Sequence, residues 1–108
     1  MILLHIALMI LLHIALQDGF LNDEVIVQVN AKEVFHESQV KTRFQIGLAA
    51  SFETNVPEGL VNVKVTLPKK KLAQSTVLEI SAPTSLGVSI TADDKIVFHV
   101  SNERFRYL

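Results

Sequence analysis

The sequence predicts an all-β protein, a small antiparallel two-sheet β-sandwich with a duplicated N-terminal strand. Three observations lead to this class. Apolar and polar residues alternate in one segment after another, turn-forming residues separate these segments at intervals of about 8–12 residues, and no stretch keeps a helical spacing. The chain has 108 residues and no Cys, so a single domain must be stabilised by its hydrophobic core rather than by disulfides. Spacing alone leaves immunoglobulin-like and jelly-roll strand orders open.

The first predicted strand is present twice. The segment Met1–Leu8 (MILLHIAL) is repeated without a single change at Met9–Leu16. Natural repeats diverge unless each copy is constrained, so an identical pair indicates a recent or engineered duplication. We therefore expect one β-sandwich domain over residues 9–108 and a surplus copy of its first strand over residues 1–8.

Both copies have the pattern of a strand that packs one face on a core. Ile or Leu occupies every second position, and the repeat length is even, so the same face stays apolar through both copies. This apolar row contains the residues that we predict to carry self-association: Ile2, Leu4, Ile6, Leu8, Ile10, Leu12, Ile14 and Leu16.

The next segments follow in order. Asp18-Gly19 has the composition of a turn and ends the repeat. In Glu24–Asn30 every second residue is Val, and the residues between them are expected on the other face of a strand. Asn30-Ala31-Lys32 predicts a hairpin turn into a strand over Glu33–His36. Val40–Ile46 alternates again and predicts a strand with one wet face.

In the second half of the chain, turn residues again separate alternating segments. Ser51–Val56 alternates up to the turn Pro57-Glu58-Gly59, and Leu60–Leu67 resumes with Val at every second position. The polar run Lys69–Lys71 predicts a solvated connection, after which Thr76–Ser81 forms the next strand.

Two short strands are expected to complete the domain. Val88–Thr91 and Lys95–Val100 flank Ala92-Asp93-Asp94, which has the composition of a hairpin turn. Beyond the repeat, the following residues are expected to be buried: Val25, Val27, Val29, Phe44, Ile46, Phe52, Val61, Val63, Val65, Leu78, Ile80, Ile96, Phe98 and Val100.

Composition and motifs argue against several functions. Ten Lys and Arg against eleven Asp and Glu, with one Tyr and no Trp, give neither a basic surface nor stacking aromatics, so nucleic acid is not an expected partner. His5 and His13 would lie roughly 26 Å apart in one extended strand, too far to share a metal ion. No catalytic or phosphate-binding motif is present. We therefore expect a protein that is not an enzyme and uses no cofactor or metal.

The apolar N-terminus raises the question of a membrane segment. Gln17-Asp18-Gly19 ends the apolar run short of the ~20 residues that a spanning helix needs. The basic start and small-residue cleavage site of a secretory signal are also missing. Membrane contact is thus not expected, and the sequence leaves the compartment open while slightly favouring the cytoplasm. The alternative hypothesis is an exported domain with an apolar leader or membrane anchor.

The surplus strand suggests self-assembly. Both copies in one straight strand would reach about 53 Å, whereas a domain of this size has a diameter of roughly 35 Å. A hairpin between the copies is disfavoured, because Leu8-Met9 offers no Gly, Asn or Asp. We expect a homo-oligomer formed by edge-strand pairing or strand exchange, with a closed, reciprocally exchanged dimer as the favoured form and fibril-like stacking as the less specific outcome. The natural ligand of the domain is not predicted.

Overall fold

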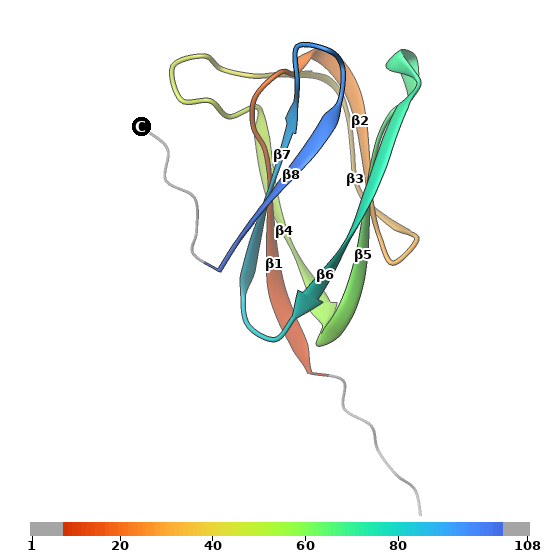
Figure 1. Ribbon diagram of the computed structural model, residues 1–108, viewed down its shortest axis with the longest axis vertical. Coiled ribbons are helices and arrows are strands. Elements are labelled where there is room, and N and C mark those ends of the chain that lie inside the picture. Colours follow the sequence, from red (N-terminus) through yellow and green to blue (C-terminus); the bar gives the residue numbers. More distant parts are fainter. Residues whose placement is uncertain (1–7, 103–108) are drawn as a thin grey trace, which may run out of the picture.

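The computed structural model describes residues 8–102 as a β-sandwich, which confirms the predicted fold class. Two four-stranded sheets pack face to face, and a single 3-10 turn, η1, lies between β5 and β6 (Figure 1). The elements are β1 (Met9–Leu16), β2 (Leu21–Val29), β3 (Lys32–Lys41), β4 (Ala50–Pro57), β5 (Gly59–Leu67), η1 (Pro68–Lys70), β6 (Leu72–Ile80), β7 (Thr84–Ile90) and β8 (Ile96–Ser101).

The strand order places the first strand inside a sheet. One sheet has the order β4-β1-β7-β8 and the other β3-β2-β5-β6. β1 pairs antiparallel with β4 but parallel with β7. This sheet is therefore mixed, whereas the sequence predicted antiparallel pairing throughout. The chain visits this sheet as β1, returns to it as β4, and enters β7 from β6 of the other sheet, in the same direction as β1. In constant-type immunoglobulin domains the first strand shares a sheet with the second, and here those two strands lie in opposite sheets.

The core lies between the two sheets and is built from the alternating residues of each strand. From β1 it receives Ile10, Leu12, Ile14 and Leu16, which are between 0 and 8% exposed. Of the residues expected in the core, the following are buried: Val25, Val27, Val29, Val61, Val63, Val65, Leu78 and Ile80. Period-two alternation therefore assigned the inner faces of β2, β5 and β6 correctly.

The outer strands are less covered than expected. Phe52 in β4 and both Ile96 and Phe98 in β8 are only half-buried, although they face inward. Val100 is 51% exposed, which corrects the expectation that it is buried. These residues lie at the edges of their sheet, where the opposite sheet covers only one side of a side chain.

The expected strand Val40–Ile46 is wrong beyond its first residues. β3 runs as one strand from Lys32 to Lys41, and the chain then turns away from the sheet. The Thr42 hydroxyl accepts a hydrogen bond from the Phe20 N–H (3.0 Å) and donates one to the Gln17 carbonyl (2.6 Å), which binds the chain to the β1–β2 connection. The next residues form a loop that crosses to β4, so Phe44 is 83% exposed rather than buried, and Ile46 is half-buried.

The exposure of Phe44 lowers the expected energetic cost of truncating its side chain. A buried Phe at position 44 would lose about 3–5 kcal/mol on truncation to Ala. At an exposed loop position Phe44→Ala should instead alter the free energy of unfolding by no more than about 0.5 kcal/mol, the same range as Arg43→Ala. Urea titration of the two variants beside the parent measures both values, and a large loss for Phe44→Ala alone would place the ring back in the core.

The predicted hairpin turns are present, and their backbones explain the residues found there. Asn30 and Ala31 both have positive φ angles (50° and 67°), as a two-residue type I′ turn requires between β2 and β3. Asp94 has φ 58° between β7 and β8, and the Thr91 N–H donates to the Lys95 carbonyl across that turn (2.8 Å).

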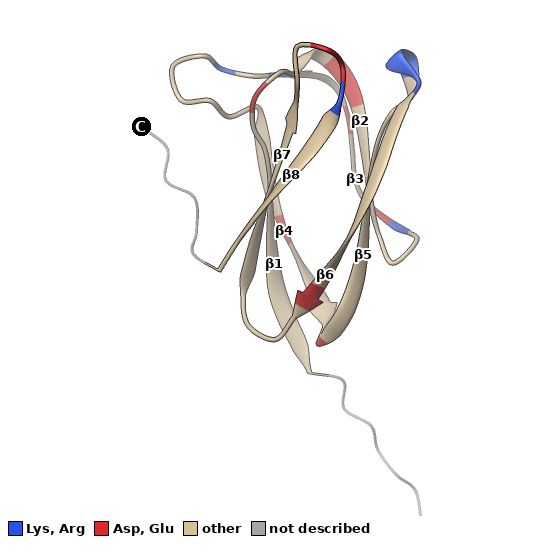
Figure 2. Cartoon of the chain, in the orientation of Figure 1, with Lys and Arg blue, Asp and Glu red and all other residues tan. Residues whose placement is uncertain are grey.

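Charged residues lie mainly at the turns and strand ends, as Figure 2 shows. The predicted connection Lys69–Lys71 overlaps η1. Lys70 Nζ lies 3.3 Å from Oδ1 of Asp23, a buried carboxylate in β2. One member of the Lys triplet therefore attaches the β5–β6 connection to its own sheet.

Candidate functional site

The position that β1 occupies is a slot between β4 and β7. Every residue from Met9 to Leu16 has a partner in β4, and those from Leu12 to Leu16 also pair with β7. The pairing continues one residue before the strand, where the Glu58 N–H donates to the Leu8 carbonyl (3.1 Å). β1 is the shared neighbour of β4 and β7, so removing it would leave both strands unpaired on that side.

The connection after β1 determines that the second copy fills this slot. The Gln17 N–H donates to the Val88 carbonyl (2.7 Å), and the Ile90 N–H donates to the Asp18 carbonyl (2.8 Å). Gly19 has φ 88°, and a Cβ there would overlap the Ile90 carbonyl oxygen. With the first copy in the slot, Met9, Ile10 and Leu11 would follow it where Gln17, Asp18 and Gly19 now lie, and Leu11 could not adopt the glycine geometry.

The structure divides the predicted self-association residues into two groups. Ile10, Leu12, Ile14 and Leu16 belong to the domain's own core. Leu8, next to the slot, is 60% exposed. Ile2, Leu4 and Ile6 lie outside the described residues. Among the predicted self-association residues that the structure describes, Leu8 is the one that lies outside the domain's own core.

The outer face of β1 carries a histidine and carboxylate pair. His13 and Glu53 are direct partners across β1 and β4, with Nδ1 and Oε1 3.6 Å apart. In the same row of the sheet, Ser85 of β7 is the partner of His13 on the other side. Ser85 is buried, so this row combines a buried hydroxyl residue with the partly exposed His13 and Glu53.

A second histidine lies in the β2–β3 hairpin. The His36 ring is 2.8 Å from the Glu24 carboxylate and 3.6 Å from that of Glu33. The hydrogen bond to Glu24 raises the pKa of His36 above its ordinary value, and the charge of Glu33 acts in the same direction. His5, which was expected not to share a metal ion with His13, is outside the described residues. Within residues 8–102 no three His, Cys, Asp or Glu side chains form a group able to hold a metal ion.

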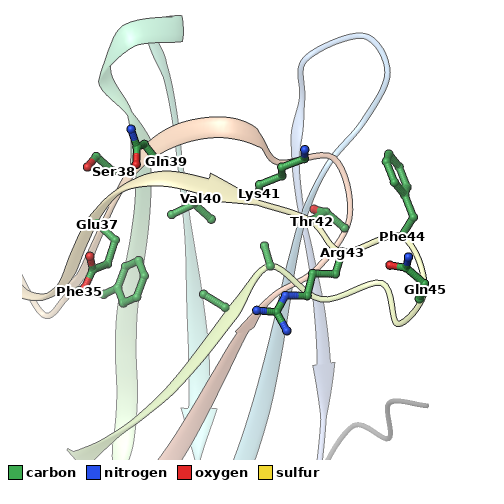
Figure 3. A pocket seen from close by; sticks show the side chains of 12 residues that line it. Phe35, Glu37, Ser38, Gln39, Val40, Lys41, Thr42, Arg43, Phe44 and Gln45 are labelled. Carbon is green, nitrogen blue, oxygen red and sulfur yellow. The ribbon is translucent and has the colours of Figure 1, made fainter.

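A hollow lies where β3 and β4 form neighbouring edges of the two sheets. It measures about 740 Å³ and is open to solvent. The rings of Phe35 and Phe52 stack beside it, with centroids 4.7 Å apart and an interplanar angle of 13°. In Figure 3, Phe35, Val40 and Arg43 surround this hollow, and Phe44 points away from them. The sequence did not predict the hollow, because the alternation through Phe44 indicated a strand where the chain forms a loop.

Comparison with known proteins gave no relative: no protein-family model, no curated protein and no solved structure matches the chain. In the described residues, no helix has the length and apolar character needed to cross a membrane. The fold and the slot thus define the class of protein, an all-β sandwich with its first strand inside a mixed sheet.

Proposed function

We propose that this protein is a non-enzymatic β-sandwich module for binding or assembly, and that it self-associates through the first copy of its duplicated strand. The observation that carries the proposal is the occupied slot. Met9–Leu16 is paired on both sides and its inward side chains are buried. An identical segment, Met1–Leu8, precedes it in the sequence and has no second slot of this kind within the described fold.

The chemistry of the first copy supports association. A strand without a neighbour leaves a row of backbone N–H and C=O groups free to pair with another chain. Ile2, Leu4 and Ile6 add apolar surface to that row, and the segment contains no Asp, Glu, Lys or Arg that would oppose pairing. Burial of these side chains against another molecule stabilises an oligomer in proportion to the apolar area removed from water.

Counting strands and slots refines the expected mode of association. Each chain supplies two copies and one slot. Reciprocal exchange between two molecules fills both slots but still leaves one copy per chain unpaired. The exchanged dimer expected from the sequence would therefore not use both copies. The proposal therefore favours addition of Met1–Leu8 to a free sheet edge of a neighbouring molecule over exchange into its slot.

Deletion of residues 1–8 tests the proposal. We expect the full chain to be oligomeric and the shortened chain to be monomeric with the same fold, because the deletion removes no residue of the described core. Static light scattering at matched concentrations measures the mass, and far-ultraviolet circular dichroism verifies the fold.

A variant of full length distinguishes an effect of the apolar row from an effect of chain length. The double variant Leu4→Lys, Ile6→Lys keeps all residues but places two charges in the row, and it should reproduce the monomer. A monodisperse monomer for the unmodified full chain would overturn the proposal.

A further inference from the structure

The two sheets present edge strands of unequal protection. The edges are β4 and β8 in one sheet and β3 and β6 in the other. β3 is irregular: its pairing with β2 contains register shifts, and Gln39 has φ 59°. β4 ends in Pro57, which cannot donate a backbone hydrogen bond. Bulges, prolines and lysines are the devices that prevent an edge from pairing with another chain.

β6 has none of these devices. All of its residues from Leu72 to Ile80 pair with β5 in unbroken register. The strand (LAQSTVLEI) contains no Lys, Arg or Pro and a single acidic residue, Glu79. A long, regular and nearly uncharged edge is a template for the addition of a further strand.

The space beside β6 is also apolar. β6 and β8 lie at neighbouring edges of the two sheets (Figure 1). Along this seam Leu72, Ile96 and Phe98 are only half-buried, and Val100 is 51% exposed although its register with Leu86 turns it inward. A hollow of about 430 Å³ opens at the end of the seam, next to Leu72 and Ile96. Inward apolar side chains are thus left partly in water on this side of the sandwich.

We propose that Met1–Leu8 of a second copy of this chain adds to β6 as a fifth strand of that sheet and covers this seam. The inference rests on the proposed function and names the edge that the surplus strand uses. An eight-residue strand spans about 26 Å, close to the length of the nine-residue β6. Its row Ile2, Leu4, Ile6 and Leu8 would pack over the partly exposed apolar residues of the seam, while Leu3, His5 and Ala7 would face outward.

The partner strand must come from another molecule. The strand direction of β1 is held as far as Leu8, whose carbonyl accepts the hydrogen bond from Glu58. To reach β6 of its own domain, the chain would have to reverse within residues 1–7, which contain no Gly, Asn, Asp or Pro. A reversal there would also leave too few residues for a strand.

A charge placed in the edge tests the site. Gln74 is exposed and lies in the inward row of β6, opposite Val65. Gln74→Lys keeps the strand's own contacts but points a charge into the proposed interface, so it should weaken association of the full chain by at least about tenfold in Kd. The matched control Gln39→Lys places the same charge in β3, on the opposite side of the sandwich, and should leave Kd within about twofold of the parent. Sedimentation equilibrium measures Kd for both.

Disulfide trapping supplies a direct test, because the chain has no Cys. We would mix His5→Cys with Ser75→Cys, both in the outward rows, and oxidise the mixture. A mixed disulfide dimer is expected for this pair and not when Ser38→Cys of β3 replaces Ser75→Cys. If deletion of residues 1–8 dissolves the oligomer while Gln74→Lys leaves it intact and no mixed disulfide forms, the β6 site is wrong and the proposed function stands. A monomeric full chain would overturn both.

Discussion

Leu12→Ala should lower the free energy of unfolding by about 2–5 kcal/mol, whereas Leu4→Ala should change it by no more than about 0.5 kcal/mol. The two substitutions remove the same atoms from the same position of the two copies. Leu12 is fully buried at the centre of β1, between partners in β4 and β7, so its truncation leaves a cavity. The slot holds one copy only, and Leu4 belongs to the other.

Urea titration of both variants measures this difference directly. It is best carried out at a concentration low enough for the chain to be monomeric, because oligomerisation makes apparent stability depend on protein concentration. Comparable losses for the two variants would show that the copies exchange in the slot. Losses that are small for both would show that the sheet holds β1 by its backbone pairing alone.

Gly19→Ala should also destabilise the fold strongly, by at least about 2 kcal/mol. Two effects combine at this position. An Ala at φ 88° is strained, and its Cβ would overlap the Ile90 carbonyl oxygen. The N–H of the same Ile90 donates to the Asp18 carbonyl and so holds the β1–β2 connection to the end of β7. Relief of that overlap would pull Asp18 away from the Ile90 N–H, so the same change would loosen the segment that selects the second copy for the slot.

Gly59→Ala is the control for the backbone component. Gly59 has φ 115°, but no atom lies within 4 Å of a Cβ built there. Its substitution should therefore show the conformational strain alone, about 1 kcal/mol. Thermal unfolding followed by circular dichroism compares the two variants. Equal shifts in Tm would mean that the contact with Ile90 adds nothing beyond strain.

Under the proposed function, the duplicated strand leads to assembly rather than to a larger domain. The slot between β4 and β7 is filled, and the pairing of β1 with β4 extends to the Leu8 carbonyl. The seam between β6 and β8 is the surface that a fifth strand would complete. A mutation in β6 and a deletion in the first copy should consequently weaken the same association by acting on its two sides.

The sequence by itself determined the fold class, the strand faces and the short hairpin turns. Alternation of Val, Ile and Leu reports which face of a strand is buried, and this held for β1, β2, β5 and β6. Asn30-Ala31 and Asp93-Asp94 adopt turns because of backbone preferences that depend only on residues close in the sequence.

Only the tertiary structure decided where β1 lies and where β3 ends. Parallel pairing of β1 with β7 joins segments far apart in the chain. The sequence of neither segment indicates which strand it pairs with. Phe44 continues the alternation of β3, yet the hydrogen bonds of Thr42 to Gln17 and Phe20 turn the chain out of the sheet before the ring is reached. The open seam between β6 and β8 likewise exists only because the two sheets are stacked with these edge strands next to each other. Periodicity records the burial of a residue's face, whereas strand neighbours and edges follow from long-range hydrogen bonds that a local pattern does not contain.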